Sequence, residues 1–435
     1  QRRRKLRQME RMLLARRQRI REALHKDFDK PPQEVDLIEI YPVLREIRHA
    51  RRHLRQWMRP HHVPTPLAFI GSRSWIHYES KGVVLIMSPW NYPLNLTLSP
   101  LVSAIAAGCT AIVKPSELTP HASQLIADLV GEVFDPTEVA VVQGGVETGQ
   151  ALLALPFHHI FFTGSMRVGR IVMHAAAQHH ASITLEMGGK CPAIIDRTAN
   201  LQAAAQRIVQ TKWANAGQTC VAPDYLLVHA SRKDALLQVM SDEIRTQYPD
   251  LDNYPAMVNQ EHFERVAGYL TEAQSEGIEI VCGGTADATS RRISPSVLDG
   301  TTATLASEEI FGPLLPVITY ESLGEAIAYI NDRPRPLGLY IYARDRRLEE
   351  QILAQTRAGG TCFNHSALNY YNNNLPFGGV NNSGFGKSHG FEGFKAFSNA
   401  RGIYRQVWRR SPVQWLRRPF TRTKEALIDI TLKWL

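Results

Sequence analysis

The stretch that decides the fold is GVVLIMSPWNYP, residues 82–93. Its first half, Val83 to Met87, is a short apolar run that lies between a glycine and a Ser-Pro pair, which is typical of a buried strand. A helix is expected to follow from Leu94 to Ala107, and the next strand covers Thr110 to Val113. This strand–helix–strand order predicts an α/β fold that is built on an open, mostly parallel sheet.

Polar or Gly-containing segments follow the successive strands of this predicted sheet. Further strands are expected over residues 139–142, 159–162 and 182–186. Because the carboxyl ends of parallel strands meet at one edge of a sheet, the segments after them are expected to surround one ligand site. The five segments are Trp90-Asn91, residues 114–117, residues 143–145, Gly164 and residues 186–188.

A second α/β unit begins after Gly189 and contains the cysteine of greatest interest. Cys220 lies in the small, polar segment NAGQTCVAP, residues 215–223, between an expected helix (201–212) and an expected strand (225–229). A substrate can approach a thiol in such a turn, and the thiolate is the reactive form. A buried, unreactive cysteine is the alternative interpretation.

These motifs resemble those of the aldehyde dehydrogenases, within the class 3 branch that includes fatty-aldehyde, aromatic-aldehyde and coniferyl-aldehyde enzymes. The resemblance covers about Tyr41 to Tyr404 and rests on SPWNYP (88–93), VKPSE (113–117), FFTGS (161–165), EMGGK (186–190) and EEIFGP (308–313). It implies a Rossmann-like cofactor domain, an α/β catalytic domain and a small bridging sheet. It also implies NAD(P)-dependent oxidation of an aromatic or medium- to long-chain aldehyde to the carboxylic acid, through a cysteine thiohemiacetal and thioester.

Three residues are predicted to be catalytic because aldehyde oxidation needs a nucleophile, an oxyanion donor and a base. Cys220 is the nucleophile. Asn91 has a neutral amide, which suits an oxyanion hole together with the Cys220 backbone N–H. Glu186 lies before a Gly-rich turn and is the candidate general base for thioester hydrolysis. Glu309 is a competing base in class 3 relatives, and Lys190 is a candidate for lowering the pKa of the thiol.

The predicted cofactor site draws on several loops. Gly164, Ser165 and Gly169 open a helix whose free N–H groups favour a phosphate, although a plain strand-to-helix turn has the same pattern. By resemblance, Lys114 and Glu117 contact the adenosine ribose. A carboxylate there favours NAD, with NADP as the alternative. The remaining cofactor residues expected are Trp90, Gly188, Glu309 and Phe311, the last two near the nicotinamide ribose.

The charge pattern bears on partners. The net charge is +9 over 435 residues, and both ends are basic while the body is mildly acidic. No basic stripe with interleaved aromatics indicates nucleic-acid binding. Peripheral contact of the basic termini with an anionic membrane is one interpretation, and solvated helix faces are the other. The five cysteines form no CxxC pair, so a metal site is not expected. Scattered cysteines fit a reducing compartment, and the expected location is the cytoplasm, with membrane association as an alternative.

The expected domains follow from these patterns. Residues 1–69 and 83–188 form the cofactor-binding domain, which begins with N-terminal helices. A Pro-rich link, His61 to Pro66, follows these helices. Residues 189–383 form the catalytic domain. Residues 70–82 and 391–410 are bridging elements of a homodimer, and 411–435 form an amphipathic tail that gates the substrate funnel, binds a membrane or packs in the dimer. The chain begins at Gln1, so a preceding targeting segment stays open.

Departures from the family pattern and rival functions complete these expectations. Asn381 stands where the family usually has glycine, and asparagine tolerates a positive φ better than most residues. Asn372 to Asn374 are expected near the substrate entrance. A coenzyme-A-acylating enzyme is one alternative function, against which Glu186 argues. The other is a catalytically silent membrane-surface or structural relative.

Overall fold

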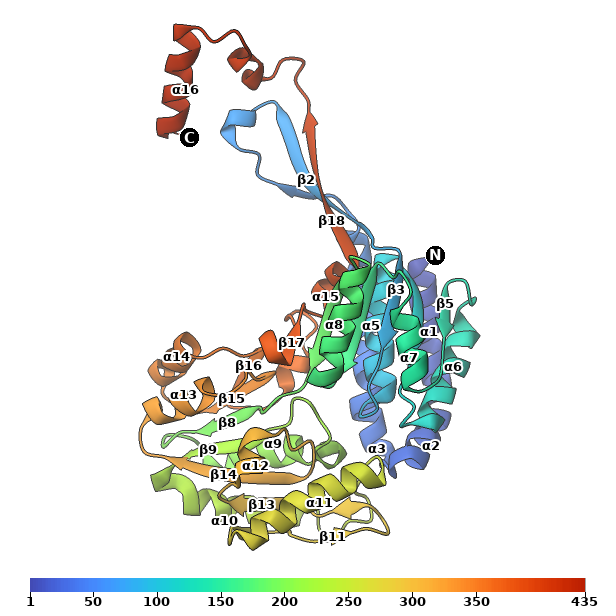
Figure 1. Cartoon of the computed structure of the whole chain (residues 1–435), viewed down its shortest axis with the longest axis vertical. Helices are drawn as coiled ribbons and strands as arrows, with labels where there is room; N and C mark the ends of the chain where they lie inside the picture. Colours follow the sequence, from blue (N-terminus) through green and yellow to red (C-terminus); the bar gives the residue numbers. More distant parts are fainter. Residues whose placement is uncertain (435) are drawn as a thin grey trace.

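The computed structural model describes residues 1–434, and Leu435 lies outside them. The first sheet has the strand order β17-β7-β6-β3-β4-β5, parallel except for β17 (Figure 1). The strand over residues 83–87 is therefore central, as a run buried on both faces should be. The strands are β3 (Val83–Met87), β4 (Thr110–Lys114), β5 (Val139–Val141), β6 (His159–Gly164), β7 (Ser182–Met187) and β17 (Gly384–Phe385).

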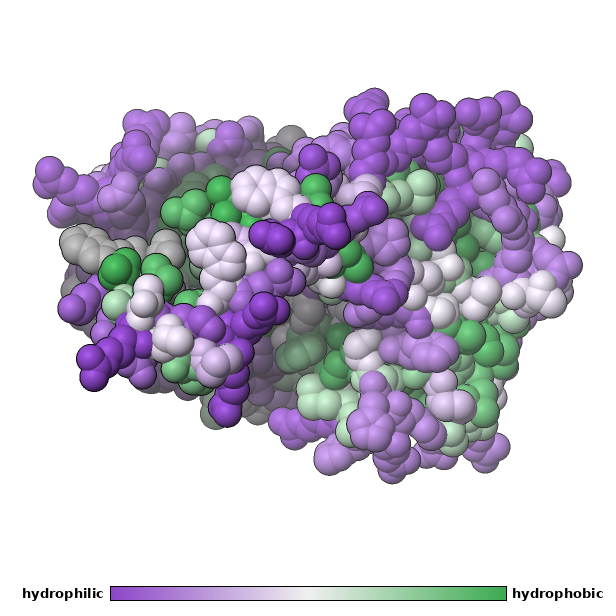
Figure 2. All heavy atoms as spheres, turned by 90° about the horizontal axis from the view of Figure 1, so that it is seen from above, coloured by the Kyte–Doolittle hydropathy of each residue, from purple (hydrophilic) through white to green (hydrophobic). Residues whose placement is uncertain are grey.

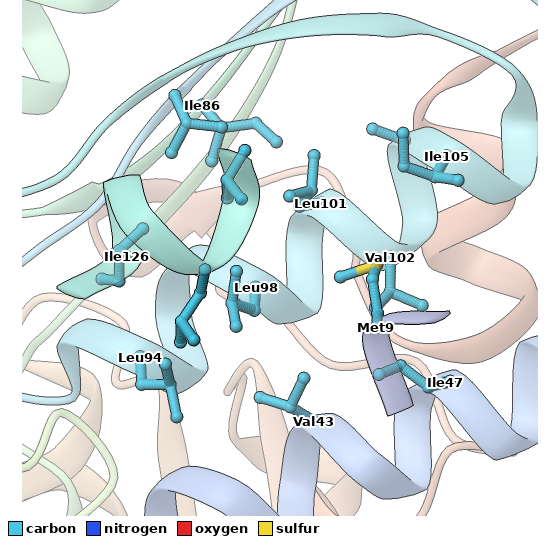
Figure 3. Close-up of a cluster of buried hydrophobic side chains, with 14 of the residues drawn as sticks. Met9, Val43, Ile47, Ile86, Leu94, Leu98, Leu101, Val102, Ile105 and Ile126 are labelled. Atoms are coloured by element: carbon cyan, nitrogen blue, oxygen red, sulfur yellow. The ribbon is translucent and has the colours of Figure 1, made fainter. Parts of the chain in front are cut away.

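Helices cover both faces of this sheet, since successive strand residues point to opposite sides. Val84 and Ile86 pack into the larger cluster, and Leu85 packs into the smaller one on the other face. The larger cluster includes helix α5, which begins at Pro93 and ends where Gly108 has a φ of 90° (Figure 3). Its helices are α1 (Arg2–Ala15), α2 (Arg17–Phe28), α4 (Tyr41–Trp57), α5 (Pro93–Ala107) and α6 (Pro120–Val133), and the smaller cluster takes α7 (Val146–Leu153) and α8 (Met166–Gln178).

The second sheet has the order β10-β13-β14-β9-β8-β15-β16 and is parallel except for β10. Its strands are β8 (Pro192–Ile195), β9 (Tyr225–His229), β10 (Glu279–Cys282), β13 (Ser296–Asp299), β14 (Leu314–Tyr320), β15 (Gly338–Tyr342) and β16 (Gly360–Phe363). Its helices are α9 (Leu201–Lys212), α10 (Lys233–Gln247), α11 (Gln260–Ser275), α12 (Ala303–Ser307), α13 (Leu323–Asn331) and α14 (Arg346–Gln355). A small hairpin of β11 (Ala286–Asp287) and β12 (Arg292–Ile293) comes between β10 and β13 in the sequence.

The third sheet, β1-β2-β18, projects from the body with the C-terminal tail at its tip (Figure 1). Long strands β2 (Ser72–Ser80) and β18 (Ser398–Gln406) pair antiparallel along their whole length. β1 (His61–Val63) adds a third strand, so the prediction of a plain Pro-rich link at 61–66 is wrong for its first residues. The expected bridging range 391–410 also begins in a helix, α15 (Gly390–Ala396), whose Phe394 packs in the core on Trp57.

The tail ends in α16 (Arg422–Trp434), in which Leu427, Ile430 and Leu432 are exposed. The side chain of Trp434 lies outside the described residues. Seen from this end, the surface of the molecule is largely hydrophilic, with apolar side chains scattered among the polar ones (Figure 2). Within residues 1–434, none of the helices is both long and apolar enough to cross a membrane.

The N-terminal helical region has an irregular segment between α2 and α4. After the short turn α3 (Pro32–Glu34), residues Val35–Ile40 form a π-helical segment that leads into α4. Such segments are rare and occur frequently at functional sites. This one carries Glu39, which is completely buried and accepts a hydrogen bond from the Asn95 N–H in the first turn of α5.

Candidate active site

A cavity of about 270 Å³ brings the three predicted catalytic residues together. Asn91 comes from the loop after β3, Glu186 from the end of β7, and Cys220 from the loop before β9. Two of the five expected segments, 114–117 and 143–145, do not reach the cavity wall. The other predicted residues in the wall are Trp90, Gly164, Ser165, Gly188, Glu309 and Phe311.

The loop that carries Cys220 is held in a tight, left-handed turn. Asn215 and Ala216 each have a φ of 53°, and Gly217 follows with a φ of 73°. A Cβ on Gly217 would lie 2.2 Å from the carbonyl oxygen of Gly312, so this position needs glycine. The turn leaves Cys220 half-buried in the cavity wall, where a substrate can reach the sulfur.

The surroundings of Cys220 disfavour the thiolate. Burial, together with the nearby carboxyl groups of Glu309 and Glu186, raises the pKa of Cys220 to about 12. Lys190 does not counteract this, because its ammonium binds the Asp224 carboxylate and two backbone carbonyls. The expectation that Lys190 lowers the pKa of the thiol is therefore wrong.

Asn91 is buried, and its side chain is oriented by the Cys220 loop. Its Nδ2 donates a hydrogen bond of 3.0 Å to the carbonyl of Gln218. Gln218 is itself fixed, since its amide donates to the carbonyl of Ala256 and accepts from the N–H of Val258. An amide nitrogen carries two hydrogens, so one remains for an oxygen in the cavity.

Glu186 is buried at the end of β7, opposite Gly384 of β17. Its Oε1 accepts a hydrogen bond of 2.9 Å from the Ser388 hydroxyl, while Oε2 has no partner among the described residues. Burial raises the pKa of Glu186 to about 8, although the Ser388 hydrogen bond and the charge of Lys387 oppose this shift. A carboxyl group that titrates near neutral pH is well matched to general base catalysis.

Glu309 is a second carboxyl group with the same property. Burial raises its pKa to about 8, against a hydrogen bond from the Gly189 N–H. Gly188 makes room for it, because a Cβ there would lie 2.2 Å from Glu309 Oε1. Phe311, two residues on, has a φ of 46°, which is unusual for an aromatic residue, and its ring lies edge-on to Trp90 at 5.3 Å.

Three predicted cofactor residues do not line the cavity. Gly169 is in α8, where a Cβ would lie 2.4 Å from the Met187 sulfur, so this glycine serves the packing of helix against strand. Lys114, the last residue of β4, forms an ion pair of 3.1 Å with Glu117, and Lys114 is buried while Glu117 is exposed. By contrast, Ser165 caps the start of α8 by accepting from the Val168 N–H at 3.4 Å.

Several cavity residues were missed by the sequence reasoning. The segment GKSHG, residues 386–390, supplies Ser388 and His389, and its glycines and polar residues were the available signal. His262 and Arg265 come from one face of α11, where nothing in their spacing marks a site. Of the Asn372 to Asn374 run, Asn373 is buried against Glu46 and does not line this cavity.

The fold and cavity define an α/β enzyme with two mainly parallel sheets and a cysteine between two carboxyl groups. Residues 1–403 match the model of the aldehyde dehydrogenase family. The chain belongs to that family.

Relatives agree with this assignment. The 4,4'-diaponeurosporen-aldehyde dehydrogenase of Staphylococcus aureus is 44% identical over 88% of this chain and 84% of its own length. A probable coniferyl aldehyde dehydrogenase of Pseudomonas aeruginosa is 41% identical over 90% and 84%. Among solved structures, substrate-bound Staphylococcus aureus AldH superposes with a TM-score of 0.94 at 40% identity, covering 99% of this chain and 94% of the other.

Proposed function

We propose that this aldehyde dehydrogenase oxidises aromatic or medium- to long-chain aldehydes to carboxylic acids, with NAD as the acceptor. The observation that carries the proposal is the single cavity that holds Cys220, Asn91 and Glu186. An acylating enzyme would instead pass the acyl group to coenzyme A, which needs no buried base to activate water.

The residues have separate roles in this reaction. The Cys220 thiol gives up its proton to solvent, and the thiolate adds to the aldehyde carbon. The Asn91 amide and the Cys220 N–H donate to the oxygen of the thiohemiacetal. Loss of hydride from that carbon leaves a thioester on the sulfur. Glu186 then takes a proton from water, which adds to the thioester and releases the carboxylic acid and the thiol.

The cavity wall also carries groups that suit a dinucleotide cofactor. Gly164 and Gly188 let backbone come close to a ligand, Ser165 starts a helix, and Glu309 offers a carboxylate to ribose hydroxyls. Bound NAD supplies the hydride acceptor, and its positively charged ring favours the thiolate. An indole-3-acetaldehyde dehydrogenase solved with NAD+ has the same fold, with a TM-score of 0.85 at 26% identity. NADP stays the alternative acceptor.

The apolar wall of the cavity supports the proposed substrate class. Leu96, Pro100, Phe161, Tyr370 and Phe377 line the cavity and exclude water from a hydrophobic aldehyde. Two of the relatives are named for 4,4'-diaponeurosporen-aldehyde and for coniferyl aldehyde, one a long-chain and the other an aromatic aldehyde, which supports the same class here. Cinnamaldehyde-type and medium- to long-chain aliphatic aldehydes are therefore the first substrates to test.

The test is formation of NADH or NADPH by the purified chain with such a panel. Cys220→Ala should abolish turnover, while Cys282→Ala, a matched half-buried thiol outside the cavity, should not. Glu186→Gln should give one burst of NADH without steady turnover, and Glu309→Gln should raise KM for NAD instead. A reversal of these last two results would make Glu309 the base. Turnover that needs coenzyme A would refute the hydrolytic proposal.

We also propose that the projecting sheet forms a homodimer interface. β18 lies at the edge of that sheet, and Trp408 and Tyr404 near its end are exposed. Light scattering should give twice the chain mass, and a variant that ends at residue 410 tests whether the tail contributes. Binding of that variant to anionic vesicles, compared with the full chain, tests membrane contact. Five free cysteines fit a reducing compartment such as the cytoplasm.

A further inference from the structure

A buried lysine lies directly behind the loop that carries Asn91. Lys30 follows α2, and none of its side chain is exposed. Its Nζ donates to Glu39 Oε1 at 3.0 Å and to the backbone carbonyl of Asn91 at 3.3 Å. The ammonium also lies 4.7 Å from the ring centroid of Phe28 and 4.9 Å from that of Tyr92. A charge this deep is kept only when all of its partners are in place.

The partner carboxylate is bound to the start of helix α5. Glu39 Oε2 accepts from the N–H of Asn95 at 2.9 Å. That N–H belongs to the first turn of α5, where backbone donors have no partner inside the helix. Lys30 and Glu39 therefore bind both sides of the turn between β3 and α5, the Asn91 carbonyl before it and the Asn95 N–H within it.

The same segment also touches the nucleophile loop. Glu34 Oε1 accepts from the backbone N–H of Asn215, the first left-handed residue of that loop. The side chain of Asn215 in turn donates to the Asn91 carbonyl at 2.9 Å, so Asn215 and Lys30 share one acceptor. Residues 30–39 thus bridge the loop of the oxyanion donor and the loop of the sulfur.

We propose that Lys30 is a positioning residue for the reaction, whose ammonium fixes the Asn91 peptide so that its side-chain amide meets the oxyanion. This inference rests on the proposed role of Asn91. The geometry supports it because the Asn91 carbonyl and side chain are both held, the carbonyl by Lys30 and Asn215 and the side chain by Gln218. Without Lys30 the peptide would lose one of two donors and the charge that orients it.

The experiment is a double-mutant cycle on the full chain. Lys30→Met alone would leave Glu39 charged and unpaired, so the pair Lys30→Met/Glu39→Gln is the variant of choice; the glutamine oxygen still accepts from Asn95. The readout is the burst rate of NADH formation, which reports hydride transfer. The pair should lower this rate roughly tenfold to a hundredfold, less than loss of an oxyanion donor itself. In an Asn91→Ala background, the same pair should change it less than about twofold.

The matched control is Lys5→Met/Glu138→Gln. Lys5 also binds a carboxylate, a backbone carbonyl and an aromatic ring, those of Glu138, Val133 and Phe134, but away from the cavity. It should leave the burst rate unchanged. Both double variants should bind NADH with the wild-type affinity, and iodoacetamide should alkylate their Cys220 at the wild-type rate. A variant whose fold is destabilised as a whole would change both quantities.

Two results would overturn the inference. One is an equal effect of the pair in the wild-type and Asn91→Ala backgrounds, since it would show that Lys30 does not act through Asn91. The other is a crystal structure of the pair variant in which the Asn91 peptide keeps its position. Absence of any NADH or NADPH formation by the wild type would instead refute the proposed function, and the crystal structure would still decide the role of Lys30.

Discussion

The Ser388 hydroxyl donates a hydrogen bond of 2.9 Å to Glu186 Oε1, although the two residues are 202 positions apart in the chain. One carboxylate oxygen is thereby fixed, and Oε2 stays without a partner among the described residues. A base needs one oxygen to be oriented and one to be free to take a proton, and this pair supplies both conditions.

Replacing Ser388 by alanine should shift the pH dependence of thioester hydrolysis upward. The Ser388 hydrogen bond lowers the pKa of Glu186, so its loss raises that pKa and leaves less carboxylate at neutral pH. A hydrogen bond to a charged group contributes about 1.5 kcal/mol, so hydrolysis at pH 7 should fall roughly tenfold. Ser290→Ala, which removes a hydroxyl from the exposed Asp287 carboxylate, should leave the profile unchanged. An unshifted profile in Ser388→Ala would contradict this account.

The wild-type enzyme should hydrolyse its thioester faster as the pH rises towards 9. Glu186 acts as a base only when ionised, and burial raises its pKa to about 8. The steady rate of the wild type should therefore increase with a midpoint near pH 8. In Glu186→Gln, the burst of NADH should be followed by no steady turnover at any of these pH values. Stopped-flow measurement of both phases between pH 6 and pH 9 checks this, and a flat steady rate would refute it.

Glu46 should make the fold less stable as the pH rises from about 4.5 to 7. Burial raises its pKa to about 7, against hydrogen bonds from the Gly390 N–H and the Asn373 amide. The folded state thus holds a proton that the unfolded chain loses above its own pKa, and the corresponding stability is gone once the pH exceeds 7.

Glu46→Gln should remove this dependence. Its free energy of unfolding relative to the wild type should rise between pH 5 and pH 8, by up to about 3 kcal/mol, since each pKa unit corresponds to roughly 1.4 kcal/mol. Denaturant unfolding at several pH values measures the difference. Glu22→Gln, on an exposed part of α2, provides the control, and a difference that does not vary with pH for Glu46→Gln would contradict the prediction.

Gly188→Ala should weaken cofactor binding. The added Cβ would lie 2.2 Å from Glu309 Oε1 and push that carboxylate away from its place in the cavity. We expect KM for NAD to rise roughly tenfold, because a displaced carboxylate loses about one charged hydrogen bond to the ligand. Gly268→Ala on α11, where a Cβ would meet nothing within 4 Å, should have no such effect. An unchanged KM would show that Glu309 does not contact the cofactor.

The sequence predicted those features that depend on local pattern. The apolar run Val83 to Met87 forms β3 with the same bounds, and Asn381 has the positive φ of 54° that its replacement of a glycine suggested. The gathering of Asn91, Glu186 and Cys220 was also predictable, because loops at the carboxyl edge of a parallel sheet must meet.

The remaining features depend on contacts between distant residues, which leave no local signature. β1 is three residues long and exists because it pairs with β2, so its Pro-rich surroundings indicated a loop. Lys30 looked like one more cation in a basic N-terminal region, and only tertiary packing buries it against Glu39. Likewise, the motif around Lys190 suggested that its charge acts on Cys220, but the structure pairs the Lys190 ammonium with the Asp224 carboxylate.

Strand β17 has a consequence for how the molecule is made. Its two residues close the first sheet beside Glu186, yet the ribosome adds them only after the whole second sheet. Until then the edge of β7 is open, and an open strand edge can pair with another chain. A stalled or shortened chain that ends before Gly384 should therefore tend to aggregate, and enzymatic activity would appear only once synthesis is nearly complete.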